Sequence, residues 1–152
     1  MADAVTSSGR YYGCYRHKLD DKKRLPIPFR WRPEEPMEFT LLVWPKHPAG
    51  ACLRVLPPER WAKLMADIEA MPNKDPNKTV LSRGLATRAA LVKIDNAGRI
   101  AIPNEMAQAA DITNEAVLAG MFGRFEIWSP KRYAQVEASD DAMVAQALQE
   151  MD

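Results

Sequence analysis

The sequence predicts a mainly β fold with short helices (α+β), built from two related units. Apolar runs of strand length, such as residues 39–44 and 116–121, are short and rich in β-branched and aromatic residues. Glycine, proline and asparagine lie between such runs, as is typical of turns. One motif also occurs twice in the 152 residues. These three observations favour two pseudo-symmetric units that share one core.

The repeated motif reads D-x-x-x-R and ends in I-P, first in residues 17–28 and again in residues 92–103. In the second copy, Asn96 and Gly98 are turn residues, because both tolerate a left-handed backbone. Each copy therefore predicts a strand, a tight turn and a second strand. The equivalent residues are Lys18/Lys93, Asp20/Asp95, Arg24/Arg99, Ile27/Ile102 and Pro28/Pro103.

The repeat continues beyond the motif, since residues 53–62 align with residues 125–134. Each half reads strand-turn-strand, short helix or loop, β-hairpin and helix. Four short strands bury little core alone, so we expect the halves to pack about a pseudo-twofold axis. The expected organisation is a flexible arm at 1–10, a first repeat at 11–72, a linker or short helix at 73–85, a second repeat at 86–138 and an acidic helical tail at 139–152.

Helices are expected where proline or serine begins an amphipathic stretch. Pro57-Pro58 suits a first helical turn, and Ser129 is a suitable N-cap for another helix. Two prolines interrupt residues 29–36, so any helix there is a single turn, whereas residues 103–110 favour a longer one. A short helix is also expected at residues 79–85. The helix after Pro57 has apolar residues at i, i+3, i+4 and i+7, namely Trp61, Leu64, Met65 and Ile68.

The formal net charge of +1 conceals an uneven distribution. Residues 16–32 contain two acids and seven basic residues: Arg16, Lys18, Lys22, Lys23, Arg24, Arg30 and Arg32. From residue 134 onwards there are no basic residues and five acids: Glu137, Asp140, Asp141, Glu150 and Asp152. Polyanion binding depends on local charge, so the basic front is the candidate binding surface.

Arg24 and Arg99 are the main candidate DNA-binding residues, because their equivalent places put them on two symmetry-related turns. Arginine can bind guanine O6 and N7 bidentately, and lysine can neutralise phosphate. Asp20, Asp95 and Gly98 are assigned to holding the turns. In an alternative interpretation, each arginine is only a local strut paired with its own aspartate. The other candidates for a DNA-binding face are Lys18, Lys22, Lys23 and Arg16 near the first turn and Lys93 and Arg88 near the second.

No catalytic or metal-binding pattern accompanies these residues. The two aspartates lack a nucleophile, a histidine or a glycine-rich phosphate loop at recognisable spacing. Cys14 and Cys52 form no C-x-x-C pair, so neither a zinc site nor a cofactor is expected. No signal peptide or membrane-spanning run is recognised, and a reducing cytoplasm is the default compartment.

Two further stretches point to a known family. Residues 12–28 read Y-G-x-x-x-x-x-L-D-D-K-K-R-L-P-I-P, and residues 120–128 read G-M-F-G-R-F-E-I-W. With the doubled D-x-x-x-R motif, they resemble the MraZ family of bacterial transcription regulators of the division and cell-wall gene cluster. The resemblance implies two tandem SpoVT-AbrB half-domains in a swapped-hairpin β-barrel. It also implies ring-shaped oligomers that bind double-stranded DNA at short G-containing direct repeats in the promoter, with Arg24, Arg99 and adjacent lysines contacting the DNA.

The first motif departs from the family pattern at Lys23. The family usually has glycine before the arginine, as Gly98 stands before Arg99. A lysine in the left-handed conformation costs on the order of 1 kcal/mol. Either the first turn has a different geometry, or the extra positive charge is useful.

The leading hypothesis is a sequence-specific DNA-binding transcription regulator that acts as an oligomer in the cytoplasm, associated with the nucleoid. The alternative is an AbrB-like protein-interaction or antitoxin-type module in which DNA binding is secondary. In that case the acidic tail serves a partner, or it covers the basic face when DNA is absent. An enzyme is not expected, because no catalytic constellation is recognised.

Overall fold

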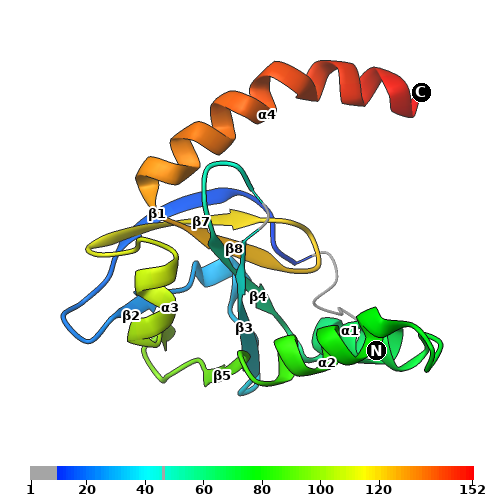
Figure 1. Cartoon of the computed structure of the whole chain (residues 1–152). Coiled ribbons are helices and arrows are strands. Elements are labelled where there is room, and N and C mark those ends of the chain that lie inside the picture. Colours follow the sequence, from blue (N-terminus) through cyan, green and yellow to red (C-terminus); the bar gives the residue numbers. More distant parts are fainter. Residues whose placement is uncertain (1–9, 46) are drawn as a thin grey trace.

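The computed structural model describes residues 10–45 and 47–152 of the chain (Figure 1). Apart from Arg10, the flexible arm expected at residues 1–10 lies outside the described residues. The helices and strands of the described part, in chain order, are β1 (Cys14–Lys18), β2 (Arg24–Pro26), the 3-10 helix η2 (Phe29–Trp31), β3 (Glu38–Trp44), β4 (Cys52–Leu56), α1 (Pro58–Glu69), α2 (Pro76–Ala86), β5 (Ala90–Lys93), β6 (Arg99–Ala101), α3 (Asn104–Ala109), β7 (Glu115–Gly120), β8 (Phe125–Trp128) and α4 (Pro130–Met151).

Six strands form one antiparallel sheet in the order β1-β7-β8-β4-β3-β5. Strands β1, β3 and β4 of the first half correspond to β5, β7 and β8 of the second. Exchanging each strand for its counterpart reverses the order, which places a pseudo-twofold axis between β4 and β8. The outer strand of each half pairs with the hairpin of the other half, β1 with β7 and β5 with β3. This exchange is the swapped arrangement that the family resemblance implies.

A separate two-stranded ladder of β2 and β6 covers the core side of this sheet. Leu25 and Ile100 face each other in this ladder, and both are completely buried. Within the described residues no ladder joins β1 to β5, so the six-stranded sheet remains open. The mainly β, α+β class is confirmed, but the strands of the described residues form an open sheet and a separate ladder and not the expected closed barrel.

The single helical turn expected near residue 29 is confirmed as η2, and it delivers Trp31 to the centre of the core. Trp31 is completely buried, and its ring centroid lies 5.7 Å from that of Tyr11 and 4.9 Å from that of Phe125. Its indole Nε1 donates a hydrogen bond to the main-chain oxygen of Tyr12 at 2.9 Å. A buried tryptophan with a satisfied N–H stabilises the contact between the two halves.

The β3–β4 and β7–β8 hairpins confirm the strand pairs expected from the apolar runs. The strands that flank each D-x-x-x-R turn behave differently, because they do not pair with each other. At the first turn the chain passes from β1 in the large sheet to β2 in the small ladder. At the second turn it passes in the same way from β5 to β6. Each turn therefore protrudes where the chain changes from one ladder to the other.

The helices differ in length from those expected. The Asp75 side chain accepts a hydrogen bond from the backbone N–H of Asn77 at 2.9 Å, so α2 begins at Pro76 rather than near residue 79. Ser129 caps α4 as expected, and this helix then runs without a break for 22 residues. Figure 1 shows α1 and α2 together at one end of the sheet, whereas α4 extends away from it. No helix in the described ranges is long and apolar enough to cross a membrane.

Candidate nucleic-acid interface

The two D-x-x-x-R turns have the same hydrogen-bond pattern. Asp20 Oδ1 accepts hydrogen bonds from the backbone N–H groups two and four residues later, at 3.0 and 2.9 Å. Asp95 Oδ1 accepts the equivalent pair, both at 2.9 Å. The second oxygen, Oδ2, accepts from the arginine Nε, at 2.6 Å for Arg24 and 3.1 Å for Arg99. Each aspartate therefore holds its turn and orients the arginine that follows.

Lys23 adopts the same left-handed backbone as its counterpart Gly98. Its φ angle is +59°, and that of Gly98 is +80°. The two turns therefore share one geometry, and the departure at Lys23 does not change the fold of the first turn. Lys23 Nζ donates a hydrogen bond to the main-chain oxygen of Thr113 at 3.0 Å. This contact ties the first turn to the loop before β7 and offsets part of the backbone cost of about 1 kcal/mol.

The ladder between β2 and β6 brings the two arginines together from positions 75 residues apart in sequence. Arg24 and Arg99 stand at opposite ends of this three-pair antiparallel ladder, on adjacent strands. The pairing continues on either side of the ladder. The backbone N–H of Ile27 donates to the oxygen of Gly98 at 2.8 Å, and that of Ile102 donates to the oxygen of Lys23 at 2.9 Å. As a result, Arg99 Nη1 lies 3.6 Å from Asp20 Oδ2 in the other turn. The two turns form a single surface.

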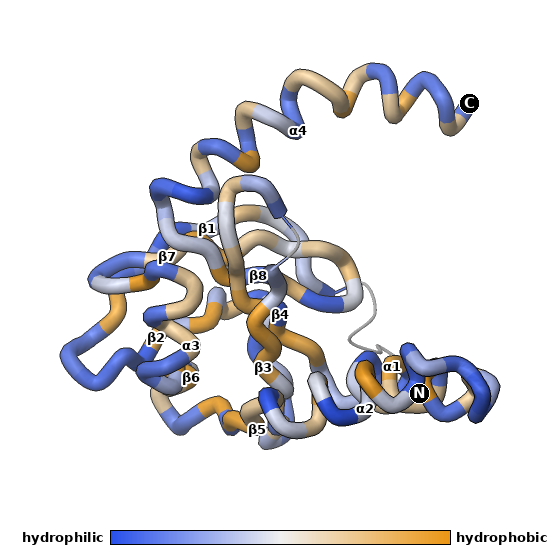
Figure 2. The backbone as a smooth tube through the Cα atoms, in the orientation of Figure 1, coloured by the Kyte–Doolittle hydropathy of each residue, from blue (hydrophilic) through white to orange (hydrophobic). Residues whose placement is uncertain are grey.

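The charges of the paired residues largely cancel. The backbone N–H of Arg24 binds the Asp20 carboxylate and lowers its pKa, and the N–H of Arg99 lowers the pKa of Asp95 in the same way. Both carboxylates are therefore ionised at neutral pH and neutralise the two arginines that they orient. The positive charge around the turns then comes from lysines, of which Lys18, Lys22 and Lys93 are exposed. Figure 2 shows the hydrophilic loop between β1 and β2 protruding from the body.

Of the two remaining candidate basic residues, Arg16 is paired with an acid and Arg88 lies apart from this surface. Arg16 is 62% exposed on β1, and its Nε lies 2.5 Å from Glu115 Oε1 on the neighbouring strand. Arg88 precedes β5 at the end far from the turn, and its guanidinium reaches toward Gly84 in α2. The structure therefore gathers Arg24, Arg99 and four lysines at the turns and places Arg88 elsewhere.

Arg32 is a basic residue at this surface that no motif in the sequence identifies. Its guanidinium packs on Gly98 so closely that a Cβ atom there would clash with it. Arg32 Nε also donates to the main-chain oxygen of Ile27 at 2.8 Å. Phe29, which is 82% exposed, lies with its ring centroid 5.7 Å from the Arg32 guanidinium carbon. The only feature of the sequence that points to Arg32 is its place in the basic segment 16–32, because no spacing links residue 32 to the second turn.

Across residues 10–45 and 47–152, no group of three or more His, Cys, Asp or Glu side chains is arranged to hold a metal ion. Burial raises the pKa of the Cys52 thiol to about 12, so this cysteine stays protonated near neutral pH. What the geometry supports is contact with an extended anion through two oriented guanidinium groups and the adjacent lysines.

Comparison with known proteins gives a family match. The family model described as "MraZ protein, putative antitoxin-like" matches residues 85–152. A "Transcriptional regulator MraZ" from Roseiflexus castenholzii is 34% identical over 144 residues, which cover 93% of this chain and 98% of that protein. Proteins of the same name from Thermomicrobium roseum and Lactiplantibacillus plantarum are each 30% identical, and cover 91% and 87% of this chain and 96% and 91% of their own lengths. The resemblance noted in the sequence is therefore confirmed, and the chain belongs to the MraZ family.

Proposed function

We propose that this chain is a sequence-specific DNA-binding transcription regulator that reads DNA through Arg24 and Arg99. The observation that carries the proposal is the β2–β6 ladder, which joins two equivalent arginine turns in one protruding surface. Relatives that cover most of the chain and are named transcriptional regulators support it.

In this proposal the two turns enter the major groove as a β-ribbon reader does. Each arginine uses Nε to bind its aspartate, which leaves terminal N–H groups to pair with guanine O6 and N7. The lysines beside the turns, Lys18, Lys22, Lys23 and Lys93, contact the phosphates. The ion pair with aspartate is then not an alternative to DNA binding, because it holds the guanidinium plane in place for base contact.

The proposed target is a set of short direct repeats in the promoter of the division and cell-wall gene cluster, bound by an oligomer in the cytoplasm at the nucleoid. Each copy would carry two repeats, residues 11–72 and 86–138, connected by residues 73–85 and followed by the tail at 139–152. Oligomerisation favours this mode, because several weak modules on spaced sites gain affinity from effective concentration.

Binding of the full-length chain to the DNA upstream of its own coding sequence tests the proposal. Arg24→Ala and Arg99→Ala should each weaken specific binding about 5- to 150-fold, since a bidentate base contact contributes about 1–3 kcal/mol. Affinity should also fall steeply with rising salt. Arg83→Ala is a matched control, because Arg83 is an exposed arginine on α2. Unchanged promoter affinity in both turn variants would refute the site assignment.

A second candidate function is a protein-interaction or antitoxin-type module with DNA binding secondary. The observation that favours it is the exposed acidic half of α4, in which every residue from 137 to 152 is exposed. Because these residues are exposed, α4 does not cover the arginine turns. Purification of the full-length chain with one stoichiometric protein and without nucleic acid would favour this function over the first.

A further inference from the structure

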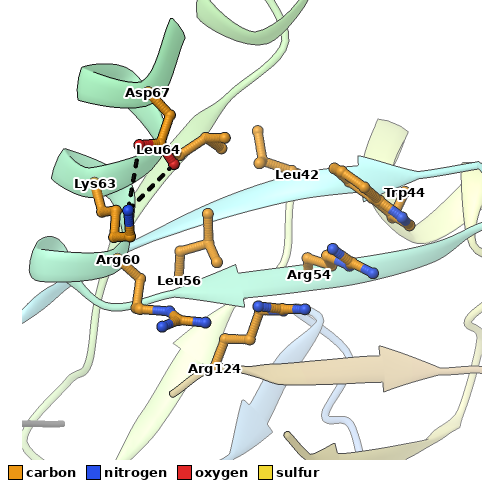
Figure 3. A pocket seen from close by; sticks show the side chains of 9 residues that line it. All are labelled: Leu42, Trp44, Arg54, Leu56, Arg60, Lys63, Leu64, Asp67 and Arg124. Atoms are coloured by element: carbon orange, nitrogen blue, oxygen red, sulfur yellow. Dashed lines mark hydrogen bonds and ion pairs between the residues drawn. The ribbon is translucent and has the colours of Figure 1, made fainter. Parts of the chain in front are cut away.

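A second cluster of basic side chains lies on the face of the large sheet that is opposite to β2 and β6. On β4, Leu53 and Val55 belong to the main core together with Leu25 of β2. Arg54 stands between them and points to the other face, because side chains alternate along a strand. There it lines a pocket of about 180 Å³ between the sheet and α1 (Figure 3). DNA bound at the arginine turns would not reach this pocket on the same copy.

Three arginines approach one another at this pocket, Arg54 from β4, Arg60 from α1 and Arg124 from the loop before β8 (Figure 3). The Arg60 guanidinium carbon lies 3.0 Å from where a Cβ of Gly123 would be, which places it directly beside the Arg124 loop. Burial lowers the pKa of Arg124, and the charges of Arg54 and Arg60 lower it further. The cluster therefore has more positive charge than its surroundings neutralise.

The acidic residues near the pocket do not hydrogen-bond the Nε atoms of Arg54 and Arg124, and the Arg54 guanidinium carbon lies 3.8 Å from the centre of the Trp44 ring. Glu126 Oε2 lies 3.5 Å from Arg54 Nε, which is an ion pair without a hydrogen bond. The other carboxylate, Asp67, binds Lys63 at 3.2 Å. Among the described residues, the buried Nε atoms of Arg54 and Arg124 have no hydrogen-bond partner. Buried N–H groups of charged side chains are costly without an acceptor, so the pocket is suited to an incoming carboxylate.

The C-terminal half of α4 has the complementary chemistry. From residue 134 onwards it contains five acids and no basic residue. Val144, Leu148 and Met151 fall at i, i+4 and i+7 and form an apolar stripe, with exposed fractions of 49%, 59% and 82%. Asp141, three residues before Val144, lies on the same face. The helical part of this segment, residues 137–151, extends about 22 Å at the usual rise, and all of its residues are exposed.

We propose that the pocket of Arg54, Arg60 and Arg124 is a carboxylate-binding site that receives the acidic half of α4 from a second copy of this chain. Carboxylates of the incoming helix bind the three guanidinium groups, and its apolar stripe packs against the half-buried Leu64 beside them. Because α4 and the pocket are different surfaces, the contact is head-to-tail, and such a contact generates a ring when its rotation closes. The inference rests on the oligomeric state proposed above and specifies the surfaces that make it.

Sedimentation velocity of the full-length chain with charge-reversal variants tests this contact. Arg60→Glu and Asp141→Arg should each raise the dissociation constant of the assembly by about tenfold or more, since each places like charges together at a desolvated contact. The double variant, Arg60→Glu with Asp141→Arg, should recover most of the assembly. Arg83→Glu, on the exposed surface of α2, should leave the mass unchanged. Arg60→Ala serves as a milder variant if the reversal impairs folding.

The outcomes separate this inference from the proposed function. An undiminished assembly in both Arg60→Glu and Arg60→Ala, or failure of the double variant to recover, would overturn the α4 contact while leaving DNA binding at Arg24 and Arg99 intact. Stoichiometric binding of inorganic phosphate at the pocket, with the assembly unchanged by Arg60→Ala, would make it a small-anion site instead. A wild-type chain that sediments as a monomer would refute both this contact and the proposed oligomer. The promoter-binding test of the Arg24 and Arg99 variants does not depend on that result.

Discussion

Replacing Gly98 by alanine should destabilise the protein through two separate contacts. Gly98 has a φ of +80°, and an alanine there costs about 1–2 kcal/mol because its Cβ crowds the following carbonyl. The new Cβ would also displace the Arg32 guanidinium, whose Nε donates to Ile27 at 2.8 Å, and losing that hydrogen bond costs about 1 kcal/mol. The expected loss is about 2–3 kcal/mol in the free energy of unfolding, or a Tm lower by roughly 4–12 °C.

Thermal unfolding followed by circular dichroism, at one fixed protein concentration, measures this effect. Lys23→Ala is the matched control, because Lys23 has a φ of +59° at the equivalent position and already has a Cβ. It loses only the exposed hydrogen bond from Nζ to Thr113, so the expected cost is about 0–1 kcal/mol. A Tm for Gly98→Ala within experimental error of that for Lys23→Ala would refute both the strain and the Arg32 contact.

Two further predictions concern stability. Hydrogen bonds to the carboxylates lower the pKa of Asp20 and Asp95 below 3.8, so each favours the folded state above that pH and loses this contribution as the pH falls toward its lowered value. Urea unfolding from about pH 6 to about pH 2 should therefore show a steeper acid-induced loss for wild type than for the Asp20→Asn/Asp95→Asn double variant, and equal slopes would contradict this. Separately, Trp31→Ala should lower the free energy of unfolding by about 3–5 kcal/mol, because Trp31 is completely buried. Trp61→Ala, at a half-buried site on α1, should cost clearly less in the same urea titration, and equal costs would contradict the central place of Trp31.

The predictions from sequence were most accurate where structure depends on nearby residues. The two hairpins follow from apolar runs separated by turn residues, and the N-cap of α4 follows from Ser129 before a proline. The bounds of α2 were less accurate, because a polar stretch that resembled a linker contains the aspartate that caps the helix. At residue 139 the expected separate tail continues α4, since no proline or glycine interrupts that helix.

The candidate site was only partly predictable. The doubled motif identified both arginines and both aspartates, and the structure places these four side chains within one network of hydrogen bonds and ion pairs. Closeness in sequence predicts Arg88 beside them, yet a strand of four residues carries the chain away from it before the turn. Arg32 was not grouped with them, because its contact to Gly98 spans 66 positions and leaves no periodic signal in the sequence.

The sequence by itself determined the shape of each arginine turn and the existence of two such turns. The physical reason is local: an aspartate carboxylate binds backbone N–H groups two and four residues later, and this needs no other part of the chain. Only the tertiary structure decided that the turns meet, that Arg32 packs on the second of them, and that three other arginines gather behind the sheet. Those arrangements depend on the pairing of β2 with β6 and on the exchange of β1 and β5 between the halves, which buries a core that neither half could bury alone.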